Sequence, residues 1–264
     1  MSTSTHICSN LLAAYKQLGA HLDDAKQARQ VFQDQGTDEA YQALRDVLNV
    51  CEETNAVFLR DAQKSTEFYS RRCTTLERLA LEAMEILLGR APVTASNETQ
   101  IIKIDVSFSA SIRISDALSL ITIFNQLQEL ECYNTEVTTL PKLPNSLLVL
   151  NCFGTPLKTL PKLPDFLQRL HCNNTKLTKL PELPDSLHWL DCGDNTLLKT
   201  LPKLPHSLEL LMCSNTAIEI LPELPDSLQQ LNISETPAAK NPVVIAKLHE
   251  KFRPGEYPGK WIRK

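Results

Sequence analysis

Cysteine is the residue type in this sequence with the widest chemical range, and five of the eight cysteines recur at a near-constant spacing. This cysteine ladder consists of Cys132, Cys152, Cys172, Cys192 and Cys213. An odd number of thiols cannot pair completely in disulfides, and a zinc site needs ligands clustered as C-x2-4-C, which this sequence lacks. We therefore predict that the ladder is made of small buried core side chains, with no metal and no cofactor.

A second chemical candidate is the pair His171 and Asp191, which would be neighbours if successive repeats pair as strands. An imidazole beside a carboxylate is the arrangement of a general base. The sequence supplies no matching nucleophile and pocket, and it contains no P-loop, G-x-S-x-G or H-E-x-x-H motif. We interpret the pair as a surface ion pair and predict that the protein is not an enzyme.

Both sets of residues belong to a segment that repeats from Leu127 to about Leu231. The period is 20 residues, except for one copy of 21 residues at 187–207, and five full copies precede a fading sixth. The unit is L-x-x-L-x-C-x-x-T-x-L-x-x-L-P-x-L-P. Repetition at this period is the signature of a solenoid, and this leucine spacing is typical of a leucine-rich repeat.

The residue order within one repeat predicts the path of each coil. Leu130 and Cys132 are two residues apart, so both face the same side of a short strand. The returning segment Leu140–Pro144 holds two prolines in five residues, which excludes a helix and favours an extended leg. We predict thin coils whose strands form a parallel β-sheet on a concave face, about 4.8 Å apart.

The pattern LPxLPxxLxxLxxxxN/TxL resembles the short repeats of the bacterial YopM and IpaH/SspH effector families. The resemblance covers residues 127–231 and departs from the families where cysteine replaces an aliphatic residue and threonine replaces asparagine; Asn195 is the exception. It implies a secreted bacterial protein that acts on a host protein in the host cell cytoplasm; without secretion, the protein would stay in the bacterial cytoplasm. The IpaH-like ligases carry a large catalytic domain after their repeats, whereas about 33 residues follow Leu231, so ligase activity is not implied.

Residues 1–90 have a different composition, with apolar residues at helical spacing. The first stripe is Ile7, Leu11, Tyr15, Leu18, Leu22, Ala25 and Phe32; the second includes Tyr41, Leu44, Leu48, Phe58, Tyr69, Ala80 and Leu87. We predict an N-terminal α-helical hairpin or bundle, and an α+β repeat protein as a whole. Two interpretations of the helices stay open: a hydrophobic cap for the solenoid, or a separate docking domain.

The segments that flank the repeats are predicted to connect or close them. Residues 91–100 are expected to be a linker, and 101–126 a divergent capping repeat with a short helix ending at Phe124. The repeats proper are placed at 127–235. Residues 236–264 are expected to form a C-terminal cap, with a helix starting at Asn241-Pro242 and a solvated basic tail from Arg253.

Charge and hydropathy restrict the class of partner. The net charge of −4 gives no indication of nucleic-acid binding, and no apolar run is long enough to span a membrane. The N-terminus lacks a secretory apolar region, although Met1–Asn10 is rich in serine and threonine, which is typical both of type III secretion signals and of frayed chain ends. Composition does not predict the oligomeric state.

The side chains that alternate with the core residues of the strands are free to bind a partner. Their apolar members, above all Trp189 beside Arg169, indicate a protein-binding surface. The predicted partner-binding residues are Glu129, Glu131, Tyr133, Val149, Asn151, Phe153, Arg169, His171, Asn173, Trp189, Asp191, Leu210 and Met212. Alternatively, the N-terminal helices could fold over this surface.

Two functions agree with these observations. The first is a non-enzymatic scaffold that holds a protein, most naturally a host protein, on its concave face. The second is an adaptor whose N-terminal helices dock onto a ubiquitin-ligase or signalling complex while the repeats select the substrate.

Overall fold

The structure is a computed structural model. The chain folds into two compact units. The structure describes residues 20, 24–31, 33–35, 39, 42–48, 50, 80–81, 84, 93–96, 101–109, 114–255 and 258–264. The N-terminal unit comprises residues 1–92 with 96–101, and the repeat unit comprises 93–95 with 102–264. Among the described residues, no helix is both long enough and apolar enough to cross a membrane.

The described parts of the N-terminal unit are helical, as the apolar spacing predicted. Residues 24–31, 33–35 and 42–48 form helix. Four members of the predicted stripes are fully buried: Ala25, Leu44, Leu48 and Ala80. The remaining stripe positions named above, from Ile7 to Leu22 and at Phe32, Tyr41, Phe58, Tyr69 and Leu87, lie outside the described residues.

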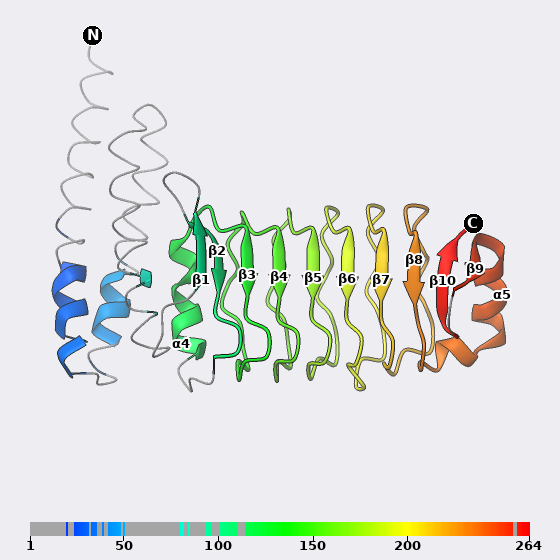
Figure 1. Cartoon of the computed structure of the whole chain (residues 1–264), viewed down its shortest axis with the longest axis horizontal. Coiled ribbons are helices and arrows are strands. Elements are labelled where there is room, and N and C mark those ends of the chain that lie inside the picture. The colour runs from blue at the N-terminus through cyan, green and yellow to red at the C-terminus, as the bar shows by residue number, and fades with distance from the viewer. Residues whose placement is uncertain are drawn as a thin grey trace, which may run out of the picture. The chain divides into compact units, whose positions relative to one another are not determined.

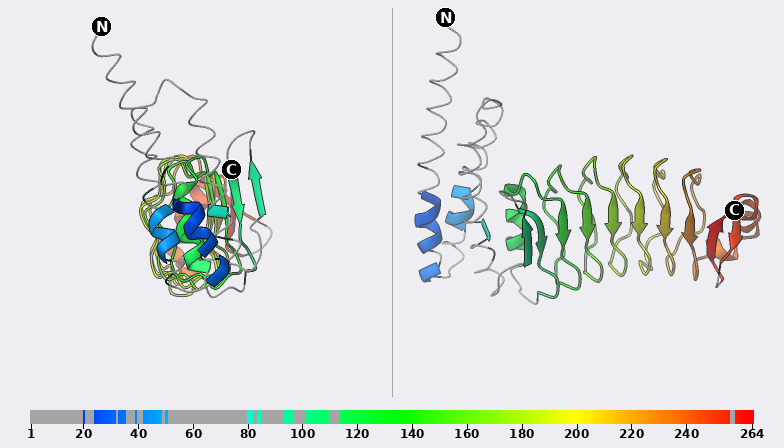
Figure 2. Two further views of the ribbon diagram at one scale, coloured as in Figure 1. Left: turned by 90° about the vertical axis from the view of Figure 1, so that its left-hand side faces the viewer. Right: turned by 45° about the horizontal axis from the view of Figure 1, so that its top comes forward.

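The repeat unit is a leucine-rich-repeat solenoid, as predicted, and each coil contributes one short strand to a single sheet (Figure 1). The repeat strands are β3 (Glu129–Glu131), β4 (Val149–Asn151), β5 (Arg169–His171), β6 (Trp189–Asp191), β7 (Leu210–Met212) and β8 (Gln230–Asn232). They pair in parallel, each with the next. The right-hand view of Figure 2 shows them following one another in a row, with the C-terminal elements beyond β8.

The core lies behind this sheet and is built from the same positions in every coil. The central strand leucines and the five ladder cysteines are fully buried, which confirms the predicted burial of the ladder. All five cysteines are free thiols, and the thiols of Cys132 and Cys152 each donate to a carbonyl oxygen of the next strand at 3.4 Å. Burial raises the pKa of Cys152 and of Cys213 to about 12, so these thiols are neutral and unreactive at physiological pH.

Threonine follows four of the five ladder cysteines by three residues and closes the turn after the strand. The hydroxyl of Thr135 donates to the carbonyl of Cys132 at 2.7 Å, and Thr155 repeats the bond one coil later. The 21-residue coil places Asn195 there instead. Its side-chain amide donates to the carbonyls of Cys172 and Cys192, both at 2.9 Å, and thereby connects two coils. The extra residue of this coil leaves Leu197 58% exposed.

Serine at the end of four of the five proline legs connects neighbouring coils. The hydroxyls of Ser146, Ser186, Ser207 and Ser227 donate to a leucine carbonyl of the preceding coil at 2.6–2.8 Å. One coil has Phe166 at this position, and its side chain is 67% exposed. The legs themselves contain neither helix nor strand, as the prolines predicted.

Replacing Phe166 by serine is expected to stabilise the repeat unit by about 1 kcal/mol, because the hydroxyl can reach the carbonyl of Leu147 as its counterparts do in other coils. Urea unfolding measures the effect. The control is Phe166→Ala, which removes the exposed ring without adding a donor. Equal stability of the two variants would show that the serine bonds contribute nothing.

The N-terminal end of the repeat unit is closed by helix rather than by a proline leg. After β1 (Val93–Ser96) and β2 (Ile101–Asp105), the chain forms α4 (Ile114–Leu118) and the 3-10 helix η1 (Ser119–Ile123). β2 pairs in parallel with β3, and the assignment of 101–126 as a capping repeat stays a prediction. The predicted linker differs from the structure: β1 lies within it and stands next to β2 in the sheet.

The C-terminal end is closed by α5 (Pro242–Lys251) and by the strands β9 (Phe252–Pro254) and β10 (Lys260–Arg263). The helix begins where predicted, since the side chain of Asn241 accepts a hydrogen bond from the amide of Val243 at 3.0 Å. The prediction of a solvated tail is wrong. β10 pairs antiparallel with β8, and Trp261 is only 5% exposed.

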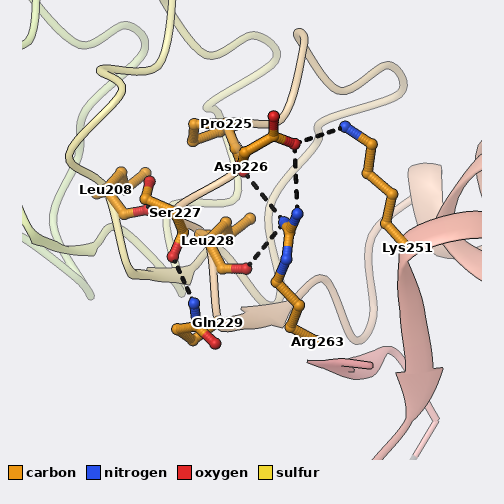
Figure 3. A network of polar contacts seen from close by, with 8 residues as sticks. All are labelled: Leu208, Pro225, Asp226, Ser227, Leu228, Gln229, Lys251 and Arg263. Carbon is orange, nitrogen blue, oxygen red and sulfur yellow. Dashed lines mark hydrogen bonds and ion pairs between the residues drawn. The ribbon is translucent and has the colours of Figure 1, made fainter.

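A polar network attaches this cap to the last coil (Figure 3). The carboxylate of Asp226 accepts from Lys251 at 3.0 Å and from Arg263 at 3.3 Å, and these two bonds lower the pKa of Asp226. Arg263 also reaches the carbonyl of Leu228 at 3.4 Å. Lys251 at the end of α5 and Arg263 of the expected tail therefore hold the cap in place.

Candidate protein-binding surface on the sheet

The parallel register converts the alternation within each strand into rows of side chains that run across the coils. We call the side of β3–β8 that faces away from the core the open sheet face. One row holds Glu129, Val149, Arg169, Trp189, Leu210 and Gln230, and the next holds Glu131, Asn151, His171, Asp191, Met212 and Asn232. The structure thus brings the predicted strand residues together on one surface. Whether a partner uses this surface stays a prediction.

Exposure along the first two rows is less than the sequence predicted. Trp189 is 38% exposed and is the only large apolar residue of these two rows to reach that level. Val149, Leu210 and Met212 are half-buried because neighbouring side chains in a row cover one another. The apolar part of the open sheet face therefore consists of the exposed indole of Trp189 and of less exposed aliphatic side chains around it.

The end of the face nearest the N-terminal cap is acidic and contains a residue that the sequence prediction missed. Lys103 of β2 pairs with Glu129 in the sheet, and its ammonium lies 3.0 Å from Glu129 and 3.7 Å from Glu131. The hydrogen bond with Glu129 raises the pKa of Lys103, although partial burial lowers it. Position three of the leucine spacing in 101–106 already marked Lys103 as part of this row.

The carboxylate of Glu131 is incompletely satisfied. Its Oε1 faces Lys103, whereas its Oε2 is buried without a hydrogen-bond partner among the described residues. A buried carboxylate oxygen without a donor is unfavourable by about 1–3 kcal/mol.

The centre of the face combines a cation, two rings and a carboxylate. Arg169 is exposed, and the rings of His171 and Trp189 lie 5.6 Å apart at a tilt of 44°. The predicted ion pair between His171 and Asp191 is not formed. Asp191 instead accepts from the amide of Gly193 at 3.2 Å, because its side chain bends back toward its own strand end.

Burial is the main cause that raises the pKa of Asp191, while the Gly193 amide and His171 act in the opposite direction. A carboxyl whose pKa is higher in the folded than in the unfolded state binds protons more tightly when folded. The folded state therefore loses stability as pH rises through the interval between the ordinary pKa of 3.8 and the raised value.

Asp191→Asn should accordingly raise the melting temperature slightly at pH 7, since the amide still accepts from Gly193 without the penalty of a buried charge. The gain should shrink on acidification and vanish below about pH 3, where the wild-type carboxyl is protonated in both states. Melting curves from pH 3 to pH 7 measure it. A gain that does not depend on pH would contradict this assignment.

Aromatic side chains border the face where the strands end. Tyr133 and Phe153 are half-buried, and Asn173 continues their row. Phe108, which the sequence prediction also missed, is 68% exposed and stacks edge-to-face on Tyr133 with ring centroids 5.1 Å apart. Its left-handed backbone conformation (φ 58°) is unusual for a phenylalanine, and no sequence motif indicated it.

The other end of the face is extended by the C-terminal cap. In the pairing of β10 with β8, Ile262 stands opposite Gln230 and Lys260 opposite Asn232. The two rows therefore continue into residues that the sequence prediction had assigned to the tail. Asn232 itself is buried and accepts from the hydroxyl of Ser234 at 2.7 Å, which leaves it little capacity for a partner.

The chain is similar to solved structures of bacterial leucine-rich-repeat effectors. No protein-family model matches the chain, and no curated protein matches it. Among solved structures, YopM from Yersinia enterocolitica WA-314 is 35% identical over 42% of this chain, with a TM-score of 0.42. YopM from Yersinia pestis, described as a leucine-rich effector protein, is 29% identical over 42%, with a TM-score of 0.39.

A Shigella effector leucine-rich-repeat domain is 24% identical over 60% of this chain, with a TM-score of 0.44. This alignment covers 79% of the Shigella chain. The present chain spans 25% of the Yersinia enterocolitica protein and 38% of the Yersinia pestis protein.

Proposed function

We propose that this chain is a non-enzymatic scaffold that binds a protein through the open sheet face. The observation that carries the proposal is the position of Trp189 at the centre of that face, exposed between Arg169 and Leu210 and bordered by charged residues. Exposed aromatic residues beside an arginine are the typical anchors of protein interfaces.

The charges along the face restrict how a partner can lie on it. Glu129 and Glu131 occupy one end, Arg169 the middle, and the aliphatic pair Leu210 and Met212 the far side of Trp189. A partner that places a basic group near Glu129 and Glu131 and an acidic group near Arg169 complements the charges at both places. The order of charges then sets the direction in which the partner crosses the coils.

The partner that we propose is a host protein, and the chain would reach it as a secreted bacterial effector. This part rests on the LPxLP repeat motif, which resembles that of the YopM and IpaH/SspH families. The proposal assigns no catalytic step to the chain.

Capture from host-cell lysate with the full-length chain tests the surface. Arg169→Glu should lose the partners that the wild type retains, because it reverses the charge at the centre of the face. The matched control is Lys199→Glu, a charge reversal at an exposed position just before the proline leg 201–205. If both variants keep the same partners, the open sheet face is not the binding surface.

An adaptor is the second candidate, favoured by the division of the chain into two compact units. In that case some partners bind the N-terminal helices and do not depend on the sheet. A double variant, Arg169→Glu with Trp189→Ala, should then still capture one set of proteins, including a ligase or signalling component. Loss of every partner would favour the scaffold alone.

A further inference from the structure

A second apolar surface lies away from the sheet, between the last proline leg and the C-terminal helix. The leg Ile220–Leu224 and α5 enclose a groove of about 680 Å³, which we call the C-terminal groove. Phe252 and Leu248 are buried at its base, and Val244 is 9% exposed. A groove of this volume with an apolar lining is in the range of binding sites rather than of packing defects.

The rims of the C-terminal groove carry exposed aliphatic side chains where polar ones would be expected. Ile220 on the leg is 71% exposed, and Val243 on the helix is 63% exposed. In the other four coils the position equivalent to Ile220 is polar: Thr139, Thr159, Lys179 and Thr200. Among the five coils, only the one that borders the groove has an isoleucine at this position, and this side chain is exposed. A bound partner that covered Ile220 would account for an apolar residue there.

The charges around the groove differ between its two walls. Lys247 and Lys251 line the helix wall one turn apart together with Glu250, and Glu223 lines the leg wall. Lys251 is neutralised by Asp226 at 3.0 Å (Figure 3), whereas Lys247 and Glu223 make no ion pair within the described residues. A bound partner would thus meet the ammonium of Lys247, with the carboxylate of Glu250 on the same helix, on one side of an apolar floor and the carboxylate of Glu223 on the other.

We propose that the C-terminal groove binds an amphipathic α-helix of a partner protein. A helix lying along α5, which is ten residues and so about 15 Å long, would present apolar residues at i, i+3 or i+4, and i+7 to the floor. Charge complementarity requires an acidic residue on the flank that faces Lys247 and a basic residue on the flank that faces Glu223. This site is separate from the open sheet face and does not depend on the function proposed above.

Selection from a library of helical peptides of about four turns, with leucine at i, i+4 and i+7 and randomised flanks, tests the proposal on the full-length chain. The enriched peptides should carry an acidic residue on one flank and a basic residue on the other. In fluorescence polarisation their affinity should fall about tenfold for Ile220→Thr. This substitution introduces the residue of the preceding coil and should leave the melting temperature unchanged.

Charge reversal supplies the second readout. The double variant Lys247→Glu with Glu223→Lys should invert the flank preference of the selected peptides, whereas Trp189→Ala should leave their binding unchanged. Failure to enrich helical peptides, or affinities that Ile220→Thr does not alter, would overturn the proposal. So would displacement of the peptides by a fatty acid, which would indicate a lipid site, or self-association of the chain that Ile220→Thr abolishes, which would indicate a second copy as occupant.

Discussion

Leu190→Asp abolishes the cooperative unfolding transition of the repeat unit. Leu190 is the fully buried centre of β6, between Leu170 and Leu211 of the neighbouring strands. No lysine or arginine is among the buried residues that the structure describes, so a carboxylate there has no cationic partner. The loss of packing adds to the cost of burying it, and the penalty exceeds about 4 kcal/mol. Circular dichroism during thermal unfolding measures the loss.

The same coil provides the matched control, because Leu197 is 58% exposed on the extra residue of the 21-residue coil. Leu197→Asp should change stability by less than about 0.5 kcal/mol. If the two variants unfold alike, the assignment of Leu190 to the core is wrong, and with it the stacking of coils on which the open sheet face depends.

Trp189→Ala weakens partner binding by about 2 kcal/mol or more, which is roughly a thirtyfold rise in Kd. The indole protrudes from the sheet and is held at one side by the ring of His171 at 5.6 Å, so it reaches a partner with little loss of conformational entropy. Phe153→Ala should act in the same direction. Isothermal titration with the captured partner measures both.

Stability separates an anchor from a structural residue in this experiment. Because Trp189 is 38% exposed and stands on the outer side of β6, its removal should move the melting temperature by only a few degrees. Leu197→Ala, which removes an exposed apolar side chain away from the sheet, should leave Kd unchanged. A Trp189→Ala variant that binds as tightly as the wild type would remove the indole from the interface.

Residue spacing predicted the repeat unit well, since each coil meets the same neighbours in the same register. Alternation around Leu130 and Cys132 defines one buried and one outer side, and parallel stacking transmits that choice to every later coil. Two prolines within five residues excluded a helical leg in each copy. A pattern repeated five times averages out local ambiguity.

Elements that occur once could not be predicted in this way. Strand β10 forms because the edge of β8 offers unpaired backbone groups, which the amide of Arg263 reaches at the carbonyl of Gln229 at 2.8 Å. The Pro/Gly-rich composition of 253–264 is typical of a tail, and the tight approach of Gly259 to Ser234 depends on the fold. The cap is thus specified by long-range contacts that no local window contains.

The sequence predicted which side chains lie on the open sheet face but not the ion pairs and hydrogen bonds that they form. Reading each strand outward from the core placed Trp189 and Arg169 correctly on one face. The pairing of Lys103 with Glu129 and the separation of Asp191 from His171 depend on side-chain reach across strands, which spacing does not specify. The C-terminal groove needs a leg and a helix that are about 20 residues apart in sequence, so no motif marked it.

Photo-crosslinking from the full-length chain tests the central claim most directly. A photoreactive residue at Gln230, exposed on the open sheet face, should attach covalently to the partner, whereas the same residue at Lys199, exposed just before the proline leg 201–205, should not. Mass spectrometry of the adducts identifies the attachment site. Crosslinking from position 199 together with none from position 230 would contradict the account, because the partner would then lie on the legs and not on the sheet.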